Sequence, residues 1–217
     1  MSHALRTIER FYGDKPRGII HIGANKGQEI PDYMESGIRP VVLVEALDEP
    51  FDRLFKAAKE ESGLYPVKSC LADVAGRSVE FFIASNGGQS SSYYEPDRHL
   101  DFYPNVKFDS SVTMVTETLD DVIDRMSDSI DPTSLDYISL DTQGSEVDIL
   151  KGGLRSLGRA RFVYMEVSYA GLYKGSPDLY DVIHFMQSYG FDICNLVMRN
   201  KGWGDALFAK KGVIGNV

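Results

Sequence analysis

The sequence has few of the features that mark membrane proteins or disulfide-rich secreted proteins. It contains only two cysteines, Cys70 and Cys194, which form neither a CxxC pair nor the spacing of a zinc site. No apolar run approaches the roughly 20 residues that a helix needs to cross a bilayer. The first residues also carry charges where a signal peptide would have an apolar core. We therefore expect free thiols, no membrane insertion and a cytoplasmic location.

Positive charge is also scarce. The chain has 23 Lys and Arg against 32 Asp and Glu, a net charge of −9, and its basic residues are scattered. Binding a nucleic-acid backbone takes clustered cations that displace counterions, so nucleic acid is not expected as a partner. Internal repeats and linker-like segments are lacking as well. With 217 residues, 43% of them hydrophobic, the chain is expected to form a single domain over residues 1–217.

Short β-branched runs alternate with helical patterns, which predicts an α/β fold with a mostly parallel sheet and helices on both faces. The expected strands are residues 18–22, 41–44, 65–69, 78–84, 136–140, 162–165, 191–197 and 206–209. The expected helices are residues 4–11, 30–37, a helix that opens at 48–50, 118–126, 145–157 and 176–190. The last two strands are joined by a short loop, so they must be antiparallel, because a parallel pair needs a long crossover.

The pattern disappears between about residues 85 and 112. This stretch is rich in Ser, Gly, Tyr and Phe and has no clear period. A loop of this length inside a compact domain usually has a function or moves. We therefore expect a long loop here that sets substrate specificity.

Two of the expected strands end in residues that suit a nucleoside. Gly23–Gly27 follow the first strand, where glycine lets the backbone approach a ligand and the next helix begins; a plain tight turn would explain the same residues. Glu45 ends the second strand, at the position where nucleotide-binding α/β folds hold ribose hydroxyls. A carboxylate there would repel a 2′-phosphate. The alternative for Glu45 is a strand-end acid that faces solvent.

Three acids follow or end two further strands. Asp141 and Glu146 come after the strand 136–140, and Glu166 ends the strand 162–165. Asp141 could instead cap the following helix, and Glu146 could complement its dipole. Brought to one sheet edge, the three carboxylates suit positioning a hydroxyl, acting as a base or holding a divalent metal through oxygen.

These residues alone indicate an enzyme with a nucleoside cofactor. The two candidates are an NAD-dependent oxidoreductase and an S-adenosylmethionine-dependent methyltransferase. The antiparallel closing pair favours the methyltransferase, since dinucleotide folds usually build their second half from parallel units. An inactive module that binds a nucleoside is a third alternative.

Colinear segments of the chain resemble the FkbM-type methyltransferases, a class I family that uses S-adenosylmethionine. The matching segments are residues 18–29 (GIIHIGANKGQE), 43–54, 118–123, 136–153 (DYISLDTQGSEVDILKGG), 165–193 and 205–211. The resemblance implies a Rossmann-like sheet of seven strands whose last strand is antiparallel. It also implies methyl transfer to oxygen, most often at a sugar hydroxyl of a glycan or a glycosylated metabolite.

The resemblance also implies roles for individual residues. The expected cofactor-binding set is His21, Gly23, Ala24, Asn25, Gly27, Glu45, Ala46, Leu71, Ala72, Asp73 and Asp141. In this set the glycine turn surrounds the amino-acid part, Glu45 takes the ribose, residues 71–73 border the adenine and Asp141 lies near the sulfonium. The chain departs from the family at His21, where an acid is common, and at Ser139, where many relatives carry Lys.

The catalytic candidates are Asp141, Glu146 and Glu166, in that order, with His99 in the long loop as an alternative base. His99 could equally be an exposed loop histidine. The loop aromatics Tyr93, Tyr94, Phe102 and Tyr103 would either stack on a sugar or pack among themselves. The oxidoreductase alternative requires NAD binding and a Tyr/Lys or His pair near the nicotinamide. No prediction follows for the oligomeric state.

Overall fold

The computed structural model describes residues 3–199 and 201–213, which build a seven-stranded sheet in the order β3-β2-β1-β7-β8-β10-β9. The strands are β1 (Ile19–Ile22), β2 (Val41–Glu45), β3 (Leu64–Lys68), β7 (Tyr137–Leu140), β8 (Phe162–Ser168), β9 (Phe191–Met198) and β10 (Trp203–Lys210). Neighbouring strands from β3 to β8 are parallel, and β10 is antiparallel to both β8 and β9. The predicted Rossmann-like sheet with an antiparallel last strand is confirmed.

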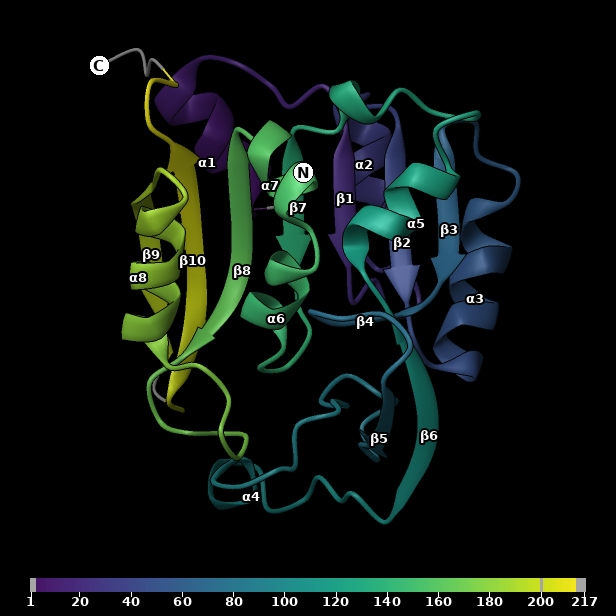
Figure 1. Ribbon diagram of the computed structural model, residues 1–217, viewed down its shortest axis with the longest axis vertical. Helices are drawn as coiled ribbons and strands as arrows, with labels where there is room; N and C mark the ends of the chain where they lie inside the picture. The colour runs from purple at the N-terminus through teal and green to yellow at the C-terminus, as the bar shows by residue number, and fades with distance from the viewer. Residues whose placement is uncertain (1–2, 200, 214–217) are drawn as a thin grey trace.

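Helices cover both faces of this sheet (Figure 1). They are α1 (His3–Tyr12), α2 (Ile30–Ser36), α3 (Asp48–Ala58), α5 (Leu119–Arg125), the short 3-10 helix η1 (Pro132–Ser134), α6 (Glu146–Lys151), α7 (Leu154–Arg159) and α8 (Leu179–Ser188). Successive strand residues point to opposite faces. Ile19 therefore joins the core with Ile8 of α1 and Leu54 of α3, whereas Ile20 joins the core that includes residues of α5 to α8.

A second, three-stranded sheet has the order β4-β6-β5, with β4 (Cys70–Leu71), β5 (Ser78–Ile83) and β6 (Ser110–Glu117). It lies with the short helix α4 (His99–Phe102) beyond the carboxyl ends of the main strands (Figure 1). The expected loop 85–112 is therefore shorter than predicted, because β6 begins at Ser110 and α4 interrupts it. The first four side chains of β6 are exposed, so the strand has no apolar pattern to reveal it.

Two helix predictions were wrong in their bounds. The expected helix 145–157 is two helices, because the chain turns at Gly152 and Gly153. A Cβ on Gly152 would lie 2.1 Å from the carbonyl oxygen of Ala72, so the backbones touch there. The last helix begins at Leu179 rather than at Ser176, because Asp178 caps it and forms a capping box with Asp181.

Strand β8 is longer than predicted. It continues to Ser168, so Glu166 lies inside the strand rather than at its end. Its partner across the antiparallel pair is Asp205 of β10.

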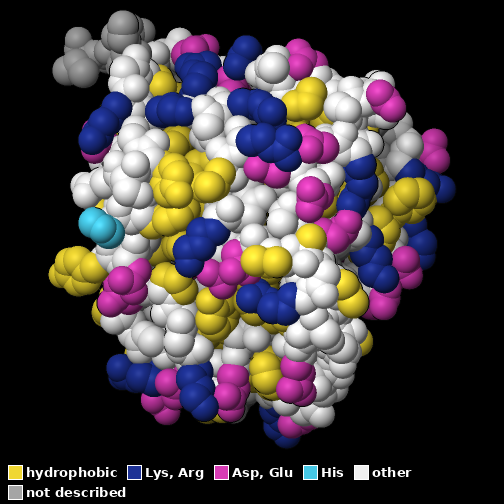
Figure 2. All heavy atoms as spheres, viewed as in Figure 1, with side chains coloured by type: hydrophobic (Ala, Val, Ile, Leu, Met, Phe, Trp, Pro, Cys, Tyr) yellow, Lys and Arg dark blue, Asp and Glu magenta, His cyan; other side chains and the backbone are white. Residues whose placement is uncertain are grey.

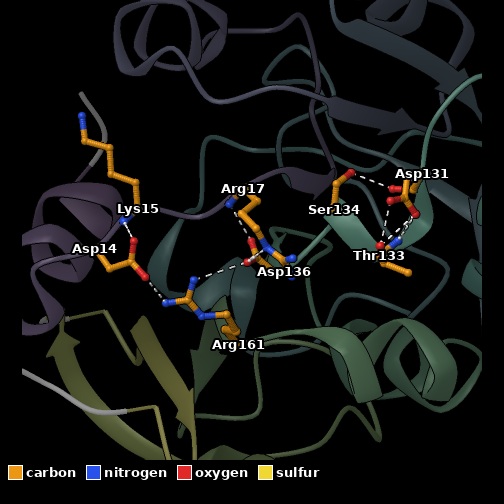
Figure 3. Close-up of polar contacts among 8 residues, drawn as sticks. All are labelled: Asp14, Lys15, Arg17, Asp131, Thr133, Ser134, Asp136 and Arg161. Carbon is orange, nitrogen blue, oxygen red and sulfur yellow. Dashed lines mark hydrogen bonds and ion pairs between the residues drawn. The ribbon is translucent and has the colours of Figure 1, made fainter.

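The amino ends of the central strands are held by a buried carboxylate. Asp136, which has no exposed side-chain surface, accepts hydrogen bonds from the backbone N–H of Arg17 (2.8 Å) and from its Nε (2.9 Å), and it lies 3.5 Å from Arg161 (Figure 3). This network joins the segments that enter β1, β7 and β8. In the described part of the chain, no helix has the length and apolar character to span a bilayer.

Candidate active site at the carboxyl edge of the sheet

A cavity of about 420 Å³ lies at the carboxyl ends of β1, β2, β7 and β8, within the range for small-molecule sites. Its cover is residues 84–109, between β5 and β6, which we call the roof segment. Nine predicted site residues line the cavity: His21, Gly23, Asn25, Glu45, Ala46, Leu71, His99, Asp141 and Glu166. Ala24, Gly27, Ala72, Asp73 and Glu146 are not among its lining residues.

The glycine turn brings β1 and β7 into close contact. Gly23 has φ +80°, and a Cβ there would lie 1.9 Å from the carbonyl oxygen of Asp141. Asn25 also has a positive φ of 45°, which Asn tolerates better than most residues. Gly27 serves packing instead, because a Cβ there would meet Ile30 and Leu54 of the neighbouring helices.

Glu45 is buried at the end of β2 and anchored by the backbone. Its Oε2 accepts the N–H of Asn25 (2.9 Å), and its Oε1 accepts the N–H of Leu47 (2.8 Å). Burial raises the pKa of Glu45, and these N–H donors oppose that rise. Each carboxylate oxygen can accept a second hydrogen bond, so Glu45 remains able to receive hydroxyl donors from the cavity.

The cavity has an apolar region near Glu45. Leu47, Leu71, Phe81 and Ile149 line it together with the thiol of Cys70. The two residues after Leu71 turn away. The carbonyl of Ala72 faces Gly152, and Asp73 pairs with Arg77 at 2.9 Å.

The opposite region holds two carboxyl groups bridged by an amide. Gln143, with a left-handed φ of 57°, donates from Nε2 to Asp141 Oδ1 (2.8 Å) and to Glu166 Oε1 (3.2 Å). Burial raises the pKa of Asp141 and, more strongly, that of Glu166. Each charge disfavours the other, so the pair holds protons more tightly than ordinary carboxyl groups.

His21 lies beside this pair as a neutral ring. Burial lowers the pKa of His21 to about 4, and its Nδ1 is 3.1 Å from the hydroxyl of Tyr33. His21 therefore supplies no charge at the position where the family commonly has an acid. Glu29, which the sequence prediction missed, supplies a carboxyl group to the same cavity wall.

Glu146 is turned toward the backbone. Its carboxylate accepts the N–H groups of Thr142 (2.9 Å) and Gly144 (3.0 Å), and burial raises its pKa to about 7. It fixes the turn that carries Asp141 and Gln143.

The roof segment is tied to the floor of the cavity through Tyr173. The Tyr173 hydroxyl lies 2.8 Å from the carbonyl oxygen of Ser90 and 2.8 Å from Gln143 Oε1. Backbone bonds from Asp97 and His99 to the carbonyl of Leu172 hold the same segment.

His99 is not the exposed loop histidine that was the alternative in the sequence. It is 2% exposed, and its ring packs against Tyr103, Phe108 and Tyr173. Its Nε2 is 3.1 Å from Ser90 Oγ, while its buried Nδ1 has no hydrogen-bond partner in the described chain. Burial lowers the pKa of His99, so the ring is neutral.

The predicted aromatic residues divide into two groups. Tyr93 and Tyr103 line the cavity, whereas the Tyr94 hydroxyl bonds to Asp148 (2.7 Å) and Phe102 packs near Trp203 and Ala170. Trp203, which the sequence prediction missed, also lines the cavity and donates from Nε1 to the Tyr103 hydroxyl at 2.6 Å.

A metal centre receives no support from the geometry. Within residues 3–199 and 201–213, no group of three or more His, Cys, Asp or Glu residues is arranged to hold a metal ion.

The strand order, the cavity at the carboxyl edge and the acid that ends β2 are those of an α/β enzyme with a nucleoside cofactor. Residues 21–193 match the methyltransferase FkbM domain. The chain belongs to this family, and it is an S-adenosylmethionine-dependent methyltransferase.

One relative and two solved structures illustrate the similarity. The 2-O-methyltransferase NoeI of Sinorhizobium fredii is 29% identical over 183 residues, which cover 79% of this chain and 71% of NoeI. Sp1610 of Streptococcus pneumoniae, solved in complex with S-adenosyl-L-methionine, has a TM-score of 0.52 at 10% identity and 97% and 73% coverage. An uncharacterized protein of Listeria monocytogenes has a TM-score of 0.53 at 10% identity and 98% and 69% coverage. These two structures show the fold.

The cavity fits the cofactor on two structural observations. Glu45 keeps acceptor capacity beside an apolar wall that suits a purine. The carboxyl groups of Glu29, Asp141 and Glu166 suit the cationic end of the cofactor.

Proposed function

We propose that this methyltransferase acts on oxygen and methylates a sugar hydroxyl of a glycan or a glycosylated metabolite. The observation that carries the proposal is the pair Asp141 and Glu166, bridged by Gln143 and facing the same cavity as Glu45. The similarity to NoeI, a 2-O-methyltransferase by name, supports oxygen as the methylated atom.

In this proposal, the cofactor lies along the sheet edge. Glu45 accepts its ribose hydroxyls, and Leu71 and Ile149 border its adenine. Glu29 faces its ammonium group, and Asp141 lies near its sulfonium. When bound, S-adenosylmethionine supplies a methyl group already activated by the sulfonium. The protein must then align the acceptor, which is worth roughly 7–11 kcal/mol of the barrier, and remove its proton.

Asp141 is the proposed base. Its side chain is exposed and lines the cavity, and its raised pKa makes it a stronger proton acceptor than an ordinary carboxylate. Gln143 orients Asp141 and leaves its second oxygen for the acceptor hydroxyl. Glu166 holds the other side of the amide, and Glu146 positions the turn.

His99 is the second candidate for the base. Its ring lines the cavity, and its buried Nδ1 has no hydrogen-bond partner in the described chain. Burial lowers the pKa of His99, which keeps the ring neutral but also weakens it as a base. The two candidates differ in location, since Asp141 belongs to the floor and His99 to the roof segment.

The first test is calorimetric titration with S-adenosylmethionine, S-adenosylhomocysteine and NAD in parallel. We expect micromolar binding of the first two compounds and none of NAD. Binding of NAD alone would contradict the assignment of the site to a methyltransferase.

The second test compares Asp141→Asn and His99→Gln with the surface control Asp192→Asn, using transfer of labelled methyl groups to sugars. Asp141→Asn is expected to lower turnover by about 10²- to 10⁴-fold, the usual contribution of a general base. The affinity for S-adenosylhomocysteine is expected to change far less. A greater loss of turnover in His99→Gln than in Asp141→Asn would assign the base to His99. Full turnover in both variants would refute a base at either position.

A further inference from the structure

The inner surface of the cavity carries charge of one sign. Its lining includes the carboxyl groups of Glu29, Glu45, Asp141 and Glu166, and none of the described lining residues is Lys or Arg. The lining histidines do not compensate for this, because burial lowers the pKa of both His21 and His99.

Two cations lie against the rings of Trp203 and Tyr103, but neither is among the residues that line the cavity. The Arg199 guanidinium lies 5.4 Å from the ring centroid of Trp203 and pairs with Asp205 at 3.0 Å. The Lys201 ammonium lies 4.3 Å from the ring centroid of Tyr103 and is exposed. Lys26, near Gly87, is also not a lining residue.

The cofactor does not reverse this imbalance. S-adenosylmethionine carries a sulfonium, an ammonium and a carboxylate, a net charge of one. Four lining carboxyl groups stand against that single charge. A phosphate or carboxylate on the acceptor would therefore meet like charge at close range, which disfavours its binding.

An aromatic wall stands at the acid end of the cavity. In the β8–β10 register, Asp205 pairs with Glu166 and Trp203 pairs with Ser168. Trp203 therefore lies two residues along the strand from the position opposite Glu166. In the sheet order, this side is away from β2 and Glu45. The hydrogen bond from Trp203 to the Tyr103 hydroxyl fixes both side chains. The wall thus offers aromatic ring surface on the side of the cavity away from Glu45.

We propose that the acceptor presents an uncharged hydroxylated ring, free of phosphate and carboxylate, and that this ring packs against Trp203. The inference rests on the proposed transfer to oxygen and narrows its substrate class. The carboxylates exclude anionic acceptors, while Trp203 and Tyr103 contact the C–H face of the ring.

The test uses matched neutral and anionic probes with the full chain. The probes are the methyl glycosides of glucose, galactose and mannose, each with its uronic acid and its 6-phosphate, together with trans-1,2-cyclohexanediol. Methyl transfer is measured with labelled cofactor. Binding is measured from the fluorescence of Trp203, the one Trp of the chain, in the presence of S-adenosylhomocysteine.

We expect each neutral glycoside that is methylated to exceed its anionic counterparts by about 100-fold or more in kcat/KM, as like-charge repulsion of this order implies. A preference for any uronic acid or phosphate overturns the proposal. Retained S-adenosylhomocysteine binding with no response to any neutral probe also overturns it. Methylation of cyclohexanediol without any sugar would refute the sugar in the proposed function and leave the charge rule intact.

Two variants separate charge from general damage. Gln89→Lys places a cation in the roof lining and is expected to raise the ratio of anionic to neutral turnover by about 10-fold or more, whereas Gln187→Lys on the exposed side of α8 is not. Trp203→Phe is expected to raise the acceptor KM without changing the affinity for S-adenosylhomocysteine, and Tyr180→Phe serves as its control. An unchanged ratio of anionic to neutral turnover in Gln89→Lys would contradict the inference.

Discussion

At the scale of single residues, the carboxyl groups at this edge of the sheet differ in what touches their oxygens. Glu45 and Glu146 each accept two backbone N–H groups, which fixes their orientation. Asp141 receives a side-chain donor and faces the cavity. The same residue type therefore shapes a turn in one place and remains available to a substrate in another.

Glu146 predicts an unusual pH dependence of stability. Burial raises its pKa from 4.5 to about 7, so the folded chain binds this proton more tightly than the unfolded chain. The stability that the folded chain gains from this proton is therefore fully present below pH 4.5 and is lost as the pH rises through about 7. Glu146→Gln cannot titrate, so its stability relative to the wild type should rise by about 3 kcal/mol across this range. Denaturant unfolding at several pH values measures the difference.

Glu60→Gln is the matched control, because the Glu60 side chain is 81% exposed. Its stability relative to the wild type should change little with pH. A Glu146→Gln variant that becomes relatively less stable at high pH would show that the backbone N–H donors dominate over burial.

Residues next to strongly apolar strands were predictable, whereas residues brought in by tertiary contacts were not. Gly23 and Asp141 directly follow buried strands and Glu45 ends one, so the strand pattern alone assigns them to one sheet edge. Trp203 reaches the cavity only through the register of β10 on β8. Its neighbours in the sequence give no sign of this.

At the scale of elements, the Tyr173 hydroxyl is the contact between the roof segment and Gln143 on the floor of the cavity. Tyr173→Phe removes the donor shared by the Ser90 carbonyl and Gln143 Oε1. We expect a loss of about 1–3 kcal/mol in stability, the cost of a buried acceptor left unpaired. We also expect a higher acceptor KM with little change in cofactor affinity. Thermal unfolding and steady-state kinetics measure the two effects.

Tyr180→Phe is the control for this variant, because Tyr180 is 78% exposed on α8. A Tyr173→Phe enzyme with lower stability and an unchanged acceptor KM would limit the hydroxyl to a structural role.

The break between α6 and α7 provides a second test of an element. Ala at Gly152 would press its Cβ against the Ala72 carbonyl, and this overpacking is expected to cost about 1–3 kcal/mol. Because Ala72 follows Leu71, cofactor affinity should fall too. In contrast, a Cβ on Gly158 in α7 meets nothing within 4 Å. Gly158→Ala should therefore stabilise the chain by about 0.5–1 kcal/mol through helix propensity. Equal effects of the two substitutions in denaturant unfolding would refute the close contact.

The elements that the sequence revealed are the buried ones. Strands β1, β2 and β7 are buried at every position, and their apolar runs identified them. Strand β6 is exposed over most of its length, and the glycines at 152 and 153 act through a contact with a distant segment. Neither feature has a local period in the sequence.

At the scale of the whole molecule, the chemistry and a major source of stability lie at opposite edges of the sheet. Basic and acidic side chains are intermixed on the face shown in Figure 2. Exposed ion pairs, such as Arg155 with Asp124 at 2.7 Å, contribute little to the free energy of unfolding. Asp136 differs because its carboxylate is fully buried between Arg17 and Arg161.

Asp136→Asn is expected to lower the free energy of unfolding by about 3 kcal/mol, since it removes a buried carboxylate and with it the counter-charge of Arg17. That is a large share of the roughly 5–15 kcal/mol that stabilises a typical domain. Arg161 keeps its pair with Asp14 at 2.6 Å. Denaturant unfolding measures the loss against Asp131→Asn. Asp131 caps the short helix η1 (Figure 3), and Asn caps equally well.

The affinity for S-adenosylhomocysteine should be unchanged in Asp136→Asn wherever the chain remains folded. Asp136 precedes β7 and Asp141 follows it, and at about 3.3 Å per residue the strand separates them by roughly 16 Å. Strand β7 is buried at every position between them, so removing a charge at one edge does not directly disturb side chains at the other. Weaker cofactor binding in the folded variant would show that the two edges are coupled and that the buried network helps to shape the cavity.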